Sequence, residues 1–274
     1  PTVLKENGYY NLFFMTHEGQ YDNMNAFFRT NGYDEVFSQE NYPADKVVNS
    51  FGVQDDFLYD YAIPVLNQRA ATGQPFFATL LSISNHPPYV IPPFFHPKTS
   101  EPETQIVEYA DWALRQFFEE ARKQPWFDNT IFVLEGDHGK LVGDAECELP
   151  ESYNHIPLMI YPSRIQPEEK TAFGGQVDIQ PTILGLLNID YLQNNFGVDL
   201  LKEERPCMFY TADNMVVGRN DTLLYLYNYE TQQELTYDIG NGKLNAVPMD
   251  DSFLPLKEYS FSMLQSAEFL VKHG

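Results

Sequence analysis

The first two thirds of the chain alternate between apolar strand patterns and amphipathic helix patterns, and no other feature constrains the fold as strongly. Strands are predicted at residues 12–15, 76–83, 130–134 and 156–161. Helices are predicted at residues 21–31, 55–71, 104–123 and 179–187. Because parallel strands need helical crossovers, this alternation predicts an α/β fold. We expect a three-layer α/β/α sandwich around a mostly parallel central sheet.

The last third has a different texture. Short β-rich segments follow one another at residues 207–210, 216–218, 222–229 and 234–238. An amphipathic helix at residues 260–272 ends the chain. These segments predict a small C-terminal antiparallel β subdomain. We therefore expect an α/β core over residues 1–200 and a β-rich subdomain with its closing helix over residues 201–274, both within one compact unit.

Composition excludes some partners. The 274 residues carry 17 Lys and Arg against 39 Asp and Glu, a formal net charge of −22. Such a surface repels nucleic acid, so no nucleic-acid partner is expected. The sequence contains no secretory leader pattern and no apolar run of about 18 residues, so the chain as given is expected to be soluble. Cys147 and Cys207 could form one disulfide bond, and the sequence leaves that open.

An adjacent acid and imidazole follow the apolar run Ile131–Leu134, which reads as a strand buried on both faces. The sequence there is Glu135-Gly136-Asp137-His138-Gly139. Ligands of open α/β sheets bind beyond the carboxyl ends of the strands. Asp137 and His138 therefore suit a divalent cation. The alternative is that the aspartate caps the next helix and the histidine bonds locally.

Three further histidines are candidate site residues. His86 follows the strand at 76–83, and the alternative for it is a structural bond to a loop carbonyl. His17 also follows a strand. His155 precedes its strand, so it reaches the same edge only if the loop after Gly139 folds back. We expect His17 and His155 to support the site rather than to bind the metal.

The stretch from Gln176 to Thr182 begins a helix. Asp178 stands at the predicted N-cap, where a carboxylate bonds free helix amides. Pro181 falls in the first turn, which tolerates proline. This reading is purely structural.

Taken together in their order, six segments resemble the sulfatase-like branch of the alkaline phosphatase superfamily, and in particular the extracellular phosphoglycerol transferases of the lipoteichoic acid synthase group. The segments are Asn31-Gly32-Tyr33-Asp34, Phe51-Gly52-Val53-Gln54-Asp55-Asp56, Ser84-Asn85-His86-Pro87-Pro88-Tyr89, Tyr109-Ala110-Asp111, Glu135-Gly136-Asp137-His138-Gly139 and Val177-Asp178-Ile179-Gln180-Pro181-Thr182. The likeness spans residues 10–190, roughly.

The resemblance implies roles for the residues. Asp137 and His138 would bind one divalent metal ion. Mn²⁺ is the expected ion, and Mg²⁺, Ca²⁺ or Zn²⁺ are the alternatives. His86 would contact the substrate's phosphate. The family's nucleophile, a threonine, and a further carboxylate ligand lie upstream of the matched segments, so the nucleophile is expected outside this chain. Thr16, which follows a strand, is the alternative nucleophile.

The implied activity is metal-dependent transfer of phosphoglycerol- or phosphoethanolamine-type groups, or phosphodiester hydrolysis, through a phospho-enzyme intermediate. The substrate would be a lipid- or glycan-linked phosphodiester. The enzyme would sit at the cell membrane through an N-terminal anchor absent from this chain, with this domain extracellular or periplasmic. The chain as given is expected to convert its substrate slowly. The alternatives are a sulfatase, whose Cys/Ser-x-Pro-x-Arg motif is absent here, or a catalytically silent module that binds a glycan or lipid head group.

Overall fold

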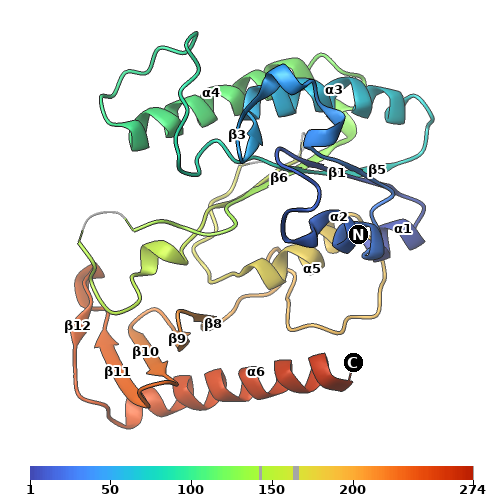
Figure 1. Ribbon diagram of the computed structural model, residues 1–274. Coiled ribbons are helices and arrows are strands. Elements are labelled where there is room, and N and C mark those ends of the chain that lie inside the picture. The colour runs from blue at the N-terminus through green and yellow to red at the C-terminus, as the bar shows by residue number, and fades with distance from the viewer. Residues whose placement is uncertain (142–143, 163–166, 274) are drawn as a thin grey trace. The chain divides into compact units, whose positions relative to one another are not determined.

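The computed structural model describes residues 1–141, 144–162 and 167–273 (Figure 1). Its contacts form two compact units. The first consists mainly of Pro1–Ile131, and the second contains Phe132–Tyr161 and most of the chain that follows. The domain boundary predicted near residue 200 rests on the change from alternating strands and helices to short β-rich segments. It stays a prediction.

The first unit is built on a parallel three-stranded sheet in the order β2–β1–β5. Its central strand β1 (Tyr10–Met15) pairs in parallel with β2 (Glu35–Phe37) and with β5 (Phe76–Leu81). Side chains of β1 alternate between the faces, so Phe13 and Met15 pack with Tyr33 on one side. Phe14 points to the other side and stacks on Phe37, with 4.7 Å between the ring centroids. The predicted parallel sheet is confirmed.

Helices cover both faces of this sheet, which confirms the three-layer arrangement within the first unit (Figure 1). On one face lie α1 (Thr2–Glu6) and α2 (Met24–Thr30), and Phe28 of α2 stacks on Phe13 at 3.8 Å. On the other lie α3 (Asp55–Ala70) and α4 (Pro102–Ala121), which pack against each other through Tyr59 and Phe117.

Two predicted boundaries are wrong for local reasons. The helix expected at 21–31 divides into η1 (Tyr21–Asn23) and α2, because Asp22 and Asn23 adopt positive φ angles of 45° and 59° that no continuous helix allows. The closing helix α6 (Leu254–His273) begins six residues before Ser260. The Asp250 carboxylate accepts a hydrogen bond from the Ser252 amide and starts a short turn, η8 (Asp251–Phe253), that leads into α6.

The second unit contains an antiparallel five-stranded sheet in the order β12–β11–β10–β9–β8. Its strands are β8 (Met208–Ala212), β9 (Met215–Arg219), β10 (Leu223–Asn228), β11 (Gln233–Asp238) and β12 (Asn245–Ala246). The predicted C-terminal antiparallel sheet is therefore confirmed. α6 packs on it through Leu256, which is buried with Tyr225 of β10. None of the helices in the described ranges combines the length and hydropathy that a bilayer crossing requires.

The acid and imidazole pair follows one strand of a two-stranded sheet. β6 (Ile131–Glu135) is hydrogen-bonded to β7 (Leu158–Pro162). The expectation that β6 is buried on both faces is wrong, because Ile131–Leu134 are only half-buried. α5 (Ile179–Leu186) follows at the predicted place.

The remaining hairpin, in the first unit, pairs β3 (Val47–Asn49) with β4 (Gly52–Val53). Cys147 and Cys207, for which the sequence left a disulfide bond open, are free thiols.

Asp34 makes one part of the first unit sensitive to acid. Its carboxylate accepts hydrogen bonds from the Asn11 amide (2.9 Å) and the Lys5 ammonium (2.8 Å). Burial opposes the charge, but these bonds outweigh burial and lower the pKa of Asp34. The stabilisation is thus complete above the unfolded-state pKa of about 3.9 and is lost as pH falls through the lower folded-state value.

We expect Asp34→Asn to lower the unfolding free energy by about 1 kcal/mol at pH 7, the usual net value of such a bond. At about pH 3, where the wild-type carboxylate begins to lose its advantage, the difference should shrink. Urea unfolding at both pH values measures it, and an equal difference at the two would contradict the assignment.

Candidate functional site

Asp137 and His138 follow β6 directly and are exposed, at 75% and 71% of their side-chain surfaces. The His138 amide donates to Asp137 Oδ1 at 2.9 Å, which fixes the carboxylate. His138 Nδ1 lies 2.8 Å from the Gly139 carbonyl oxygen. Since a carbonyl only accepts, Nδ1 carries the proton and the lone pair of the neutral ring is on Nε2. Asp137 Oδ2 and His138 Nε2 face each other at 3.8 Å.

This donor pair suits a metal ion. Two ligand atoms that each lie about 2.1 Å from one ion are about 3–4 Å apart. The bond from Nδ1 to a carbonyl is the usual support of a metal-binding histidine, because it orients the ring and makes Nε2 more basic. Among the described residues no third His, Cys, Asp or Glu completes such a group. The pair therefore fits as part of a ligand set.

The loop after Gly139 folds back along the strand end. The Gly139 amide donates to the Tyr153 carbonyl at 2.8 Å, and the Gly136 amide donates to Pro157 at 3.3 Å. The amino end of β7, with His155 just before it, thus lies beside the carboxyl end of β6. A Cβ atom on Gly139 would lie 1.9 Å from the Ser152 carbonyl oxygen, so this close approach requires glycine.

The returning loop is held by the C-terminal sheet. Leu149 is 1% exposed and belongs to the apolar cluster of β9, β10 and β11. Glu151, the first residue of the turn η5 (Glu151–Tyr153), forms an ion pair with Arg219 of β9. Tyr237 of β11 donates a hydrogen bond to Glu148. The sheet predicted as an appendage therefore supports the loop that contacts Gly139.

Asp178 occupies the predicted N-cap position of α5, but its side chain does not bond the amides of that helix. Its fully buried carboxylate accepts hydrogen bonds from the amides of Gly175 and Val198, both at 2.8 Å, rather than from the amides of α5. Arg205 binds the same carboxylate through Nε at 2.9 Å and Nη2 at 2.5 Å. Burial opposes the guanidinium charge, but Asp178 outweighs it and raises the pKa of Arg205. The physical reason for the difference is a partner 27 residues away.

Gln176 connects this buried pair to the turn that contains Asp137 and His138. It begins η6 (Gln176–Asp178), and its side-chain amide donates to the Asp137 carbonyl at 2.9 Å and reaches the Gly136 carbonyl at 3.4 Å. The sequence predicts only a structural role for this stretch, and nothing in it predicts the contact of Gln176 with Asp137. Its only signal was a polar side chain two residues before Asp178, which is too common to stand out.

In the first unit, the rings of Tyr21 and Phe51 connect the two predicted site histidines, His17 and His86. His17 lies 4.8 Å from Tyr21, Tyr21 lies 6.5 Å from Phe51, and Phe51 lies 4.3 Å from His86, all between ring centroids. The structure thus brings His17 and His86 into one aromatic row. His17 is 3% exposed, and its Nδ1 lies 3.1 Å from the Glu18 carbonyl. Neither Tyr21 nor Phe51 was predicted as a site residue.

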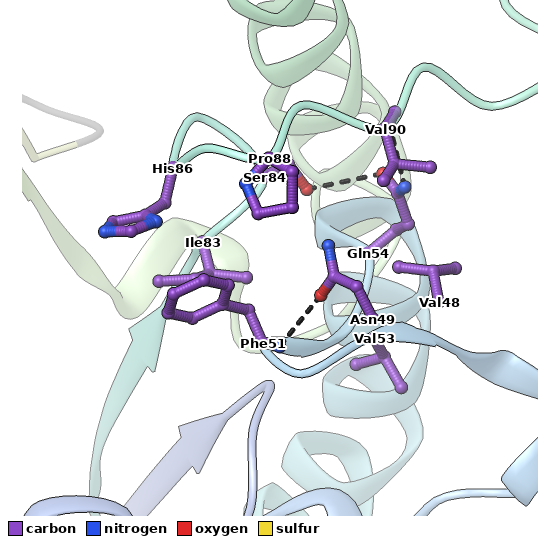
Figure 2. A pocket seen from close by; sticks show the side chains of 10 residues that line it. All are labelled: Val48, Asn49, Phe51, Val53, Gln54, Ile83, Ser84, His86, Pro88 and Val90. Atoms are coloured by element: carbon purple, nitrogen blue, oxygen red, sulfur yellow. Dashed lines mark hydrogen bonds between the residues drawn. The ribbon is translucent and has the colours of Figure 1, made fainter.

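His86 is the exposed end of this row. Its Nδ1 lies 2.6 Å from the Pro87 carbonyl, so Nε2 is free to meet a ligand. Figure 2 shows its ring beside that of Phe51, at the edge of a pocket that Ser84 and Gln54 also line. That pocket measures about 10 Å³, room for roughly one water molecule. It is too small for a lipid or sugar head group, so a substrate would meet His86 from outside.

Asp55 holds the strand end that carries His86. Its buried carboxylate accepts hydrogen bonds from the amides of Ile83 (2.9 Å) and Ser84 (3.0 Å). The Ser84 hydroxyl accepts one from the Asp55 amide at 3.0 Å. Burial raises the pKa of Asp55 despite these bonds. The start of α3 and the end of β5 are thereby fastened together.

Thr16 does not suit attack on a substrate. Its side chain is fully buried, and its hydroxyl has no hydrogen-bond partner among the described residues. A nucleophilic hydroxyl needs both access and a group that accepts its proton. We therefore leave Thr16 out of the candidate site.

Comparison with known proteins places these residues in a family context. The sulfatase family model matches residues 1–189. Lipoteichoic acid synthase 1 of Bacillus subtilis (strain 168) is 26% identical over 266 residues, which cover 89% of this chain and 40% of that protein. Lipoteichoic acid synthase 2 of the same organism is 26% identical and is matched over 74% of this chain and 34% of its own length. The chain thus spans two fifths or less of these relatives.

Solved structures agree on the fold. A protein in the alkaline phosphatase superfamily from Vibrio parahaemolyticus superposes with a TM-score of 0.85 at 28% identity, over 98% of this chain and 68% of that one. A lipoteichoic acid synthase from Listeria monocytogenes has a TM-score of 0.82 at 23% identity, over 98% and 72% of the respective chains. The α/β architecture with its C-terminal antiparallel sheet is the fold of this superfamily.

Proposed function

The chain belongs to the sulfatase family, and from that membership we propose that the whole protein transfers phosphoglycerol- or phosphoethanolamine-type groups, or hydrolyses phosphodiesters. Its relatives named lipoteichoic acid synthases support this choice within the family. We propose a lipid- or glycan-linked phosphodiester as the substrate, and a location at the cell membrane with this domain outside the cytoplasm.

The observation that carries the proposal is the pair of free donor atoms on Asp137 and His138, 3.8 Å apart on exposed side chains. We propose that they hold one divalent metal ion. Mn²⁺ is the expected ion, and Mg²⁺, Ca²⁺ or Zn²⁺ are the alternatives. When bound, such an ion neutralises negative charge on phosphate oxygens. A chain of net charge −22 needs a local positive charge to accept an anionic ester.

His86 is proposed to contact the phosphate. Because its Nδ1 is held by the Pro87 carbonyl, Nε2 is the atom that faces a ligand. In the protonated ring, Nε2 can donate to a phosphate oxygen or give its proton to the leaving alkoxide as the P–O bond breaks. The phosphoryl group would first bond to an enzyme hydroxyl and then to an acceptor alcohol or water. His17 and His155 are proposed to support the site.

We expect the chain to bind Mn²⁺ weakly and Asp137→Ala to weaken that binding at least about 100-fold, since even removal of a residue that only supports a ligand costs 10–100-fold. Isothermal titration measures both. Asp221→Ala, which removes an exposed aspartate from a turn, is the matched control and should bind as the wild type does. Equal binding by the Asp137 and Asp221 variants would remove Asp137 from the ligand set.

The reaction is tested with the whole protein in vesicles that contain phosphatidylglycerol. With Mn²⁺ present we expect release of diacylglycerol, and loss of that release in His86→Ala. Hydrolysis of an aryl sulfate without diacylglycerol release would support a sulfatase instead. If the protein shows neither activity but binds glycan or lipid head groups, a catalytically silent module would be supported.

A separate test uses residues 1–274 alone. Tight Mn²⁺ binding together with phosphodiesterase activity by this chain would contradict the expectation that it is poorly active.

A further inference from the structure

Gln176 holds the peptide unit that joins the two metal-ligand residues. The carbonyl oxygen of Asp137 and the amide nitrogen of His138 belong to one peptide plane. The oxygen accepts a hydrogen bond from Gln176 Nε2 at 2.9 Å, and the nitrogen donates to Asp137 Oδ1 at 2.9 Å. Both edges of the plane are therefore held. Since a peptide is rigid, fixing its plane fixes the Cα positions of both residues. The bonds from Asp137 Oδ1 to the His138 amide and from His138 Nδ1 to the Gly139 carbonyl then limit how the two side chains turn.

Gln176 is itself well anchored although its side chain is exposed. The residue before it, Gly175, donates its amide to Asp178, and Asp178 is buried against Arg205. These bonds fix the backbone on both sides of Gln176. Because the two acceptors, in the turn after β6, are carbonyls, only the NH₂ group of the glutamine can face them.

A second support acts on the other side of the turn. The Gly139 amide donates to the Tyr153 carbonyl, and η5 is tied to the C-terminal sheet by the ion pair of Glu151 and Arg219. The turn of residues 136–139 is thus held between η6 and η5. Of the two supports, only Gln176 uses a side chain to contact the turn, so it can be removed without disturbing a backbone path.

We propose that Gln176 is a positioning residue that aims Asp137 and His138 at a common ion. This inference rests on the proposed metal site and deepens it. Without the amide, the peptide plane between the two ligands can rotate, and the 3.8 Å arrangement of Oδ2 and Nε2 becomes one of several. The ion must then order the two side chains as it binds. This cost weakens the binding of the metal.

The first test needs no metal. Backbone amide exchange of His138 and Gly139, followed by NMR, should be faster in Gln176→Ala than in the wild type. Gln180→Ala removes the same side chain four residues later, where its recorded partner is Asn195, and should leave exchange unchanged. Gln176→Lys keeps a donor that can reach the carbonyls and should restore part of the protection. Unchanged exchange in Gln176→Ala would overturn the proposal.

The second test titrates Mn²⁺ into the same variants. We expect about 10-fold weaker binding in Gln176→Ala, the lower end of the usual effect of a supporting residue, and wild-type binding in Gln180→Ala. Wild-type Mn²⁺ affinity in Gln176→Ala would also overturn the proposal. If the wild type binds no metal yet amide exchange rises in Gln176→Ala, the metal site fails while the positioning of the turn by Gln176 stands.

Discussion

Arg205→Met is expected to lower the unfolding free energy by about 3–5 kcal/mol, the usual cost of breaking a buried ion pair. Asp178 is fully buried, and the Arg205 side chain is only 9% exposed. Methionine fills similar space but leaves the carboxylate charged in a protein interior. Urea unfolding, followed by circular dichroism, measures the loss. Because Asp178 is the last residue of η6, which also contains Gln176, the variant should also expose the amides of the turn at Gly139.

Two controls separate the buried charge from loss of an arginine. Arg115 pairs with Asp111 on the surface of α4, where the side chains are 64% and 70% exposed, so Arg115→Met should cost less than about 1 kcal/mol. Asp178→Asn added to Arg205→Met removes the stranded charge and should recover part of the loss. A cost in Arg205→Met no larger than that in Arg115→Met would show that the buried pair is not important for stability.

Gly52→Ala should lower the unfolding free energy by about 2–5 kcal/mol through backbone strain and steric overlap. Gly52 has φ = +90°, and a Cβ atom there would lie 1.8 Å from the Thr16 carbonyl oxygen. Alanine is strained by about 1–2 kcal/mol at a left-handed residue, and the overlap with the backbone adds a packing cost of about 1–3 kcal/mol. Since Gly52 follows Phe51, relief of the clash should also move the ring that packs on His86. Urea unfolding and the NMR signals of His86 report the two effects.

Gly73 offers a matched control for that substitution. It has a similar φ of +76°, but nothing lies within 4 Å of the place that a Cβ would take. Gly73→Ala should therefore show the backbone strain alone, about 1–2 kcal/mol, and leave His86 unchanged. If the two alanine variants lose equal stability, close contact between Gly52 and Thr16 makes no contribution.

The local patterns of the sequence were enough to predict most of the elements. The apolar rhythm of residues 104–123 became α4, and the short alternating segments after residue 201 became the antiparallel sheet. Hydrophobic period is a property of neighbouring residues, so it can be read without knowing the path of the chain. The pairing of Asp137 with His138 is equally local, since the two are adjacent and the first bonds the amide of the second.

The boundaries that failed depended on single residues. Asp22 and Asn23 interrupt a continuous apolar pattern through their positive φ angles, which the pattern does not register. The start of α6 was placed too late because Leu256 is buried against Tyr225, which lies in a strand distant in the sequence. In both places the local preference and the tertiary structure differ.

The sequence by itself therefore determined the kinds of element, their order and the adjacent donor pair after β6. Only the tertiary structure decided which side chains support that pair. Gln176 meets Asp137 across 39 residues, and Arg205 meets Asp178 across 27. Phe51 packs against His86 although β4, α3 and β5 separate them in the chain. Contacts of this kind depend on where loops return the chain, and the energy that fixes those returns comes from packing and buried charge rather than from any local pattern.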